Sequence, residues 1–112
     1  MSVKIVIVGS TGKLGTKLLN FTNKYSIPIY GATCYRNYKK LNNQKNNYNI
    51  NKSFVLNNSV ERFKFLKLLE EKINILYFLD YGSLSLSYLD HFLKFNKESV
   101  IAIANKEMII AG

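Results

Sequence analysis

Short apolar segments of strand length alternate with helix-length segments from one end of this sequence to the other. The first, residues 3–8, is an almost unbroken β-branched run, which is typical of a strand buried on both faces of a sheet. Parallel strands need crossover connections, and helices between successive strands supply them. The alternation therefore predicts an α/β domain with a parallel sheet and helices on both faces. A chain of 112 residues has room for one such domain.

Hydrophobic periodicity gives the expected bounds of the elements. The further strands are expected at residues 27–33, 54–56, 75–79 and 100–104. The helices are expected at 13–24, after Asn58 and at 84–95, and residues 107–111 resemble the opening of another helix. Residues 38–48 predict a weak helix at best, because asparagine side chains compete with the helical backbone for hydrogen bonds.

Two of these helices show an apolar stripe, which normally faces a core. Asn58 is the expected N-cap of the second one, with Glu61 as the acid that reaches back to it. In the first helix the stripe consists of Leu14, Leu18, Leu19 and Phe21. In the second it consists of Val60, Phe63, Leu66, Leu69 and Ile73.

Three glycines, Gly9, Gly12 and Gly15, lie between the first strand and the first helix in the spacing G-x-x-G-x-x-G. Gly9 would permit the sharp turn, Gly12 would let a pyrophosphate approach the backbone, and Gly15 would let the helix pack closely on the sheet. The free N–H groups and the dipole of the helix start would face the phosphates. The pattern favours a Rossmann-like, NAD(P)-binding domain; a glycine turn without a ligand is the alternative.

The end of the second strand reads T-C-Y-R-N and contains no carboxylate. An NAD site usually has Asp or Glu there to bind the ribose 2′-hydroxyl. Arg36 instead offers a planar fork suited to a 2′-phosphate, and Asn37 could hydrogen-bond the same group. This chemistry favours NADPH as the cofactor, unless Arg36 is an ordinary solvated arginine.

The formal net charge of +9 arises from 16 Lys and Arg against 7 Asp and Glu, but the basic residues are scattered. We interpret them as lysine-rich composition or as complementary to phosphorylated ligands, and expect no nucleic-acid partner. No apolar run approaches the roughly 20 residues of a membrane span, so no membrane partner is expected. One cysteine, Cys34, excludes an internal disulfide and a cysteine-based metal cluster. A cytoplasmic location is expected.

Three motifs carry a resemblance to a known family. The segment A-N-K-E-M-I-I-A-G at residues 104–112 is similar to A-N-K-E-S-L-V-x-x-G, and G-S-T-G-K-L-G at residues 9–15 is similar to G-S-T-G-S-I-G. Asn37, Leu41 and Gln44 match an N-x-x-x-L-x-x-Q pattern. On these residues the chain resembles the N-terminal, NADPH-binding part of the 1-deoxy-D-xylulose 5-phosphate reductoisomerases.

The resemblance implies an oxidoreductase that rearranges a phosphorylated sugar and reduces it with NADPH to 2-C-methyl-D-erythritol 4-phosphate for isoprenoid synthesis, with Mg or Mn as metal. Lys106 would then bind the substrate. The residues implied to contact the cofactor are Gly9, Thr11, Gly12, Lys13, Leu14, Gly15, Tyr35, Arg36, Asn37, Asn105 and Glu107.

Some positions depart from the family pattern. Tyr35 stands where the family has glycine, Lys13 replaces serine, and Asp80 lies in a segment that is G-A-A-G-L in the family. The resemblance also implies that residues 1–112 are a truncated NADPH-binding domain, inactive alone, without the family's metal ligands or the domains that a homodimer would need. Two alternatives stay open: a non-catalytic dinucleotide-binding module or remnant, and another NADPH-dependent reductase of the aspartate-semialdehyde type.

Overall fold

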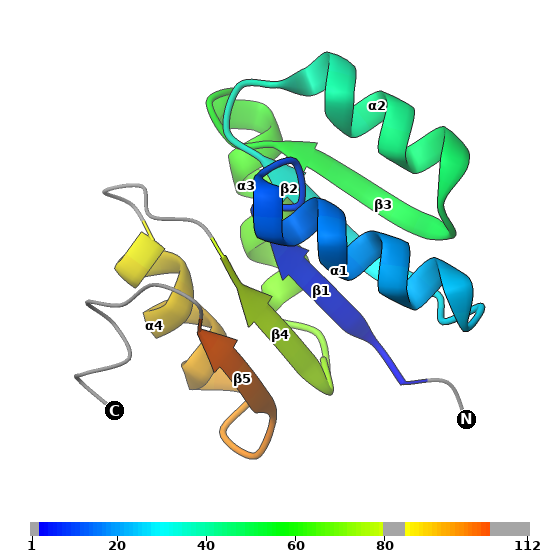
Figure 1. Cartoon of the computed structure of the whole chain (residues 1–112). Coiled ribbons are helices and arrows are strands. Elements are labelled where there is room, and N and C mark those ends of the chain that lie inside the picture. Colours follow the sequence, from blue (N-terminus) through cyan, green and yellow to red (C-terminus); the bar gives the residue numbers. More distant parts are fainter. Residues whose placement is uncertain (1–2, 80–84, 104–112) are drawn as a thin grey trace.

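The computed structural model describes residues 3–79 and 85–103, and Figure 1 shows their arrangement. Within them, five strands form one parallel sheet in the order β3-β2-β1-β4-β5. The strands are β1 (Ile5–Val8), β2 (Ile29–Cys34), β3 (Ile50–Val55), β4 (Ile75–Phe78) and β5 (Val100–Ile103). The helices are α1 (Lys13–Lys24), α2 (Tyr38–Asn47), α3 (Ser59–Leu69) and α4 (Ser85–Phe95). No helix in these two ranges is long and apolar enough to cross a membrane.

Helices cover both faces of the sheet, as predicted. The side chains of β1 alternate between the two layers because successive residues of a strand point to opposite faces. Val6 and Val8 pack in a core cluster with residues of α3 and α4, whereas Ile5 and Ile7 pack in a second cluster with residues of α1 and α2. Burial on both faces explains why β1 is an uninterrupted apolar run.

The parallel register brings the carboxyl ends of the strands together at one edge. Val8, the last residue of β1, pairs with Thr33 of β2 and with Phe78 of β4. The glycine-rich turn follows Val8 directly, so it lies at this carboxyl edge, beside the loop that leaves β2 (Figure 1). Open α/β sheets bind their ligands at this edge.

Strand β3 is longer than the sequence predicted. It begins at Ile50, which pairs with Ile29 of β2, and it continues through the exposed residues Asn51 and Lys52. An edge strand keeps part of its surface in water, so polar residues are compatible with it, and hydrophobic patterning alone does not detect it.

The two apolar stripes predicted for α1 and α3 are wrong in part. Leu19 is buried as predicted, but Leu14 and Phe21 are about half exposed. In α3, Val60 and Phe63 are each 61% exposed. The residues that α3 buries are Phe65, Leu68 and Leu69. Both helices carry apolar residues on more than one side, so periodicity could not show which side meets the sheet.

At the start of α3 the predicted N-cap is confirmed, but the predicted contact of the acid with the cap residue is wrong. The Asn58 side chain accepts hydrogen bonds from the backbone N–H groups of Val60 and Glu61, at 2.9 and 3.1 Å. The Glu61 carboxylate, however, accepts from the N–H of Val55 at 3.4 Å and not from the cap residue. The acid therefore ties the helix to the end of β3.

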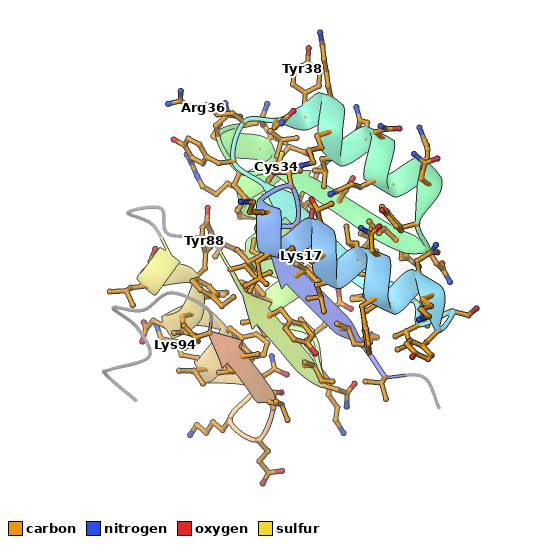
Figure 2. The ribbon with its side chains drawn as sticks, in the orientation of Figure 1. Lys17, Cys34, Arg36, Tyr38, Tyr88 and Lys94 are labelled. Atoms are coloured by element: carbon orange, nitrogen blue, oxygen red, sulfur yellow. The ribbon has the colours of Figure 1, made fainter. Side chains whose placement is uncertain are left out.

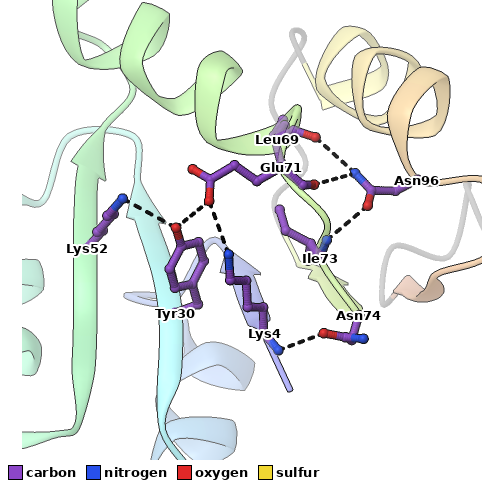
Figure 3. A network of polar contacts seen from close by, with 8 residues as sticks. All are labelled: Lys4, Tyr30, Lys52, Leu69, Glu71, Ile73, Asn74 and Asn96. Atoms are coloured by element: carbon purple, nitrogen blue, oxygen red, sulfur yellow. Dashed lines mark hydrogen bonds and ion pairs between the residues drawn. The ribbon is translucent and has the colours of Figure 1, made fainter. Parts of the chain in front are cut away.

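Two polar networks close the opposite, amino-terminal edge of the sheet (Figure 3). Asn96, which is 5% exposed, accepts from the N–H of Ile73 and donates to the carbonyl oxygens of Leu69 and Glu71 at 2.9–3.0 Å. These bonds join the end of α4 to the loop between α3 and β4. A buried amide without hydrogen-bond partners is costly, so Asn96 favours the arrangement in which the end of α4 lies against the end of α3.

The second network surrounds the Glu71 carboxylate. Tyr30 donates its hydroxyl to this carboxylate at 2.5 Å, and the Lys4 ammonium lies 3.3 Å away. Partial burial raises the pKa of the Glu71 carboxyl. The hydrogen bonds from Tyr30 and Lys4 and the charges of Lys4 and Lys52 together lower the pKa by more than burial raises it, so the pKa lies below the ordinary 4.5. The ionised form is therefore favoured in the folded chain.

We expect Glu71→Gln to destabilise the domain at pH 7 and to have little effect at low pH. A carboxyl whose pKa is lower when folded stabilises the fold above its ordinary pKa, and that contribution is lost as the pH falls through the folded value. Urea denaturation from pH 7 down to pH 3 tests this, with Glu98→Gln as an exposed control. A Glu71→Gln deficit that stays constant over this range would contradict the assignment.

Candidate functional site

The turn between β1 and α1 needs glycine at two of its three glycine positions for reasons of backbone geometry. Gly9 has φ = 93°, a left-handed conformation that side chains disfavour. A Cβ on Gly15 would lie 2.5 Å from the carbonyl oxygen of Gly9 and 2.6 Å from the Cα of Ser10. The sharp turn predicted at Gly9 is confirmed. Gly15 allows a close approach as expected, but the helix approaches the backbone of the turn at Gly9 and Ser10 and not a strand of the sheet.

Gly12 is different, because none of the residues that the structure describes around it requires it to be glycine. Its φ is −72°, and the nearest atom to a Cβ built there would be the carbonyl oxygen of Gly9, at an ordinary 3.8 Å. Gly12 is also the N-cap of α1, so no side chain caps the helix, and the first turn contains no acid. The first N–H groups of a helix lack intrahelical partners. An anionic group is thus favoured at this position.

A cleft of about 340 Å³ opens beside this helix start. The residues that line it are Gly9, Gly12, Lys13, Leu14, Gly15, Lys17 and Leu79. Lys13 and Lys17 are both exposed, and Lys17 is labelled on α1 in Figure 2. Sequence reasoning missed Lys17; its spacing of four residues from Lys13 places both on one side of the helix and was the available signal. Among the described residues, the charged groups that line the cleft are these two cations, and the positive end of the helix dipole lies beside them.

The loop after β2 carries the second group of predicted residues. Tyr35, Arg36 and Asn37 are all exposed, and Arg36 is labelled in Figure 2. The Arg36 guanidinium carbon lies 5.4 Å from the centroid of the Tyr35 ring. The Asn37 side-chain oxygen accepts from the N–H of Lys40 at 3.2 Å and so caps α2. Because this oxygen is already bonded, Asn37 would contact a phosphate through its NH₂ group, which is the donor that a phosphate oxygen needs.

Backbone hydrogen bonds hold the turn and the end of β2 together. The N–H groups of Gly9 and Ser10 both donate to the carbonyl oxygen of Thr33, at 3.2 and 2.9 Å. Gly9 N–H also lies 3.2 Å from the Thr33 hydroxyl. The two groups of predicted residues are therefore adjacent at the carboxyl edge of the sheet.

The remaining predicted residues, Asn105, Lys106 and Glu107, and the departing residue Asp80, lie outside the described residues. Among the residues that the structure describes, no group of three or more His, Cys, Asp or Glu side chains could hold a metal ion. This part of the chain does not fit the Mg or Mn of the family.

Comparisons with known proteins bear on the fold and on the family resemblance. No protein-family model matches the chain. The 1-deoxy-D-xylulose 5-phosphate reductoisomerase of Pelagibacter ubique (strain HTCC1062) is 33% identical over 130 residues, which cover 97% of this chain and 33% of that protein. Among solved structures, 1-deoxy-D-xylulose 5-phosphate reductoisomerase from Zymomonas mobilis in complex with NADPH superposes with a TM-score of 0.78 at 16% identity. That match covers 100% of this chain and 34% of the other. The chain thus spans about a third of the length of either protein.

Proposed function

Since the chain is related to the N-terminal, NADPH-binding part of the 1-deoxy-D-xylulose 5-phosphate reductoisomerases, we propose that it binds NADPH across the carboxyl edge of its sheet. Residues 1–112 act in this proposal as the NADPH-binding domain. NADPH supplies a hydride when it is bound. The chain's own residues hold and orient the cofactor.

The observation that carries the proposal is Gly12. No described residue of the fold needs a glycine there, yet Gly12 stands at the uncapped start of α1, facing the cleft that Lys13 and Lys17 also line. A glycine at such a position is explained by a ligand that must approach the backbone closely. We assign the cofactor pyrophosphate to this position, with the first N–H groups of α1 as donors and Thr11 and Leu14 beside them.

The 2′-phosphate end of the cofactor is assigned to the loop after β2. Arg36 would pair with the 2′-phosphate, and the Asn37 NH₂ group would donate a hydrogen bond to the same phosphate. No carboxylate stands next to either residue in the sequence, so no neighbouring negative charge would repel the phosphate. Tyr35, against which Arg36 lies, would border the adenosine ribose. Asn105 and Glu107 are proposed as further NADPH contacts and Lys106 as a contact to a phosphorylated sugar.

We expect the chain to bind NADPH more tightly than NADH. Arg36→Ala should remove most of that preference by raising the Kd for NADPH roughly tenfold. A hydrogen bond to a charged group contributes about 1.5–3 kcal/mol, and solvent weakens an exposed one. Calorimetric titration of the wild-type chain and the variant with both cofactors measures the effect.

Lys97→Ala is the matched control, because it removes one exposed positive charge from the loop between α4 and β5, at the opposite edge of the sheet. It should leave the preference unchanged. Equal affinity of the wild-type chain for both cofactors would contradict the role of Arg36. Absence of binding to either cofactor would contradict the proposed function itself.

A further inference from the structure

We propose that Gln44 is a positioning residue of the cofactor site, which holds the glycine-rich turn in its binding shape from the neighbouring helix α2. The inference deepens the proposed function and rests on it. Gln44 lies far from the turn in sequence, and it is 4% exposed. Its amide reaches the segment between Gly9 and Thr16, where the pyrophosphate is assigned.

Both ends of the Gln44 amide are used in this contact. The Ser10 hydroxyl donates to the Gln44 side-chain oxygen at 2.9 Å. The Gln44 side-chain nitrogen donates to the carbonyl oxygen of Ser10 at 3.0 Å and to the Thr16 hydroxyl at 3.5 Å. The Thr16 hydroxyl in turn donates to the carbonyl oxygen of Gly12 at 2.8 Å. A chain of hydrogen bonds thus runs from α2 to the residue that faces the ligand.

The turn needs such support because of its composition. Gly9, Gly12 and Gly15 leave the backbone many conformations, and binding selects the one in which the N–H groups point at the phosphates. A buried bidentate contact fixes that conformation before the ligand arrives, which lowers the cost of binding. Ser10 is fully buried, so its hydrogen bonds with Gln44 are not exchanged for water.

The geometry of α2 explains how one helix can do this. Asn37, Leu41 and Gln44 follow one another at spacings of four and three residues and so lie on one side of the helix. Asn37 caps the helix, and Leu41, which is 1% exposed, anchors it in the core cluster that includes Leu19 of α1. Gln44 is then presented to the turn at the other end of the same side.

The test compares Gln44→Met, which keeps the length of the side chain and removes its hydrogen bonds, with Asn46→Met on the exposed side of α2. Affinities for NADPH and for adenosine 2′-monophosphate are measured on folded protein. We expect Gln44→Met to weaken NADPH binding roughly tenfold, the equivalent of one hydrogen bond. Adenosine 2′-monophosphate, which carries no pyrophosphate, should bind both variants as it binds the wild-type chain.

A second measurement separates positioning from general stability. The backbone amide signals of Ser10, Gly12 and Gly15 in ¹H–¹⁵N spectra without cofactor should shift in Gln44→Met and stay in place in Asn46→Met. Phe92→Leu, a change in the core on the opposite face of the sheet, should lower the melting temperature without altering the NADPH affinity. If Gln44→Met does not fold, Ser10→Ala removes one partner of the contact and should reduce NADPH affinity in the same direction.

The outcomes are distinguishable. Unchanged NADPH affinity in Gln44→Met, or an equal loss for both ligands, overturns the positioning role while the proposed function stands. If the wild-type chain binds no NADPH, the proposed function fails, and unshifted turn signals in the variant would then overturn the role of Gln44 as well.

Discussion

Replacing Gly12 by alanine should leave the fold intact and remove most of the NADPH affinity, whereas the same replacement at Gly15 should cost much of the stability of the domain. Among the described residues a methyl group on Gly12 meets one ordinary contact, at 3.8 Å, so we expect a change within about 0.5 kcal/mol in the free energy of unfolding. That methyl group would nevertheless stand between the helix start and the pyrophosphate, and a loss of more than tenfold in affinity is expected.

At Gly15 the methyl group would lie 2.5 Å from a backbone oxygen, and no flexible side chain can move out of its way. Forcing extra volume into such a site costs about 3 kcal/mol, the upper end of the usual range for overpacking. Small domains are stable by only about 5–15 kcal/mol, so this is a large part of the total.

Urea denaturation followed by circular dichroism measures both stabilities, and calorimetry measures NADPH binding to the folded variants. The two substitutions serve as controls for each other, because each adds one methyl group to the same turn. Wild-type NADPH affinity in Gly12→Ala would contradict the assignment of the pyrophosphate to Gly12, on which the proposed function depends. Wild-type stability in Gly15→Ala would show that the turn can relax away from the start of α1.

The second prediction is that the 112-residue chain alone does not turn over 1-deoxy-D-xylulose 5-phosphate with NADPH and Mg. Lys106 is the one residue that the family resemblance assigns to the substrate, and no metal-binding group lies among the described residues. Without further contacts the substrate is not oriented over the cofactor, and correct orientation can contribute about 7–11 kcal/mol to lowering a barrier. A chain that binds NADPH and performs no chemistry is therefore the expected result.

The assay follows the loss of NADPH absorbance with and without substrate, and mass spectrometry identifies any product. The reductoisomerase of Pelagibacter ubique, of which this chain spans about a third, is the positive control. Substrate-dependent NADPH oxidation by the isolated chain that disappears in Lys106→Ala would falsify this prediction, because the chain would then contain enough of the catalytic site.

The sequence alone predicted the fold class, because burial on both faces makes a parallel strand an apolar run and crossover connections require helices between such strands. It also placed α1 at residues 13–24, since the glycine turn before it and the apolar periodicity within it mark both ends. It also predicted the sharp turn at Gly9 and a close approach at Gly15, because a left-handed φ and a close backbone contact each demand glycine locally; that the partner of Gly15 is the turn and not the sheet was visible only in the structure. The family resemblance is likewise confirmed.

Tertiary structure alone decided which side of each helix is buried. Phe63 and Phe65 are equally apolar and two residues apart, yet Phe63 is largely exposed and Phe65 is fully buried. The sequence does not record how a helix is rotated against the sheet; the packing of its neighbours sets that rotation. Tertiary structure also decided the role of Gln44, for which the sequence showed only a spacing within a motif. Its contact with Ser10 exists only because α2 packs beside the turn, and hydrogen bonds between segments so distant in sequence leave no local pattern.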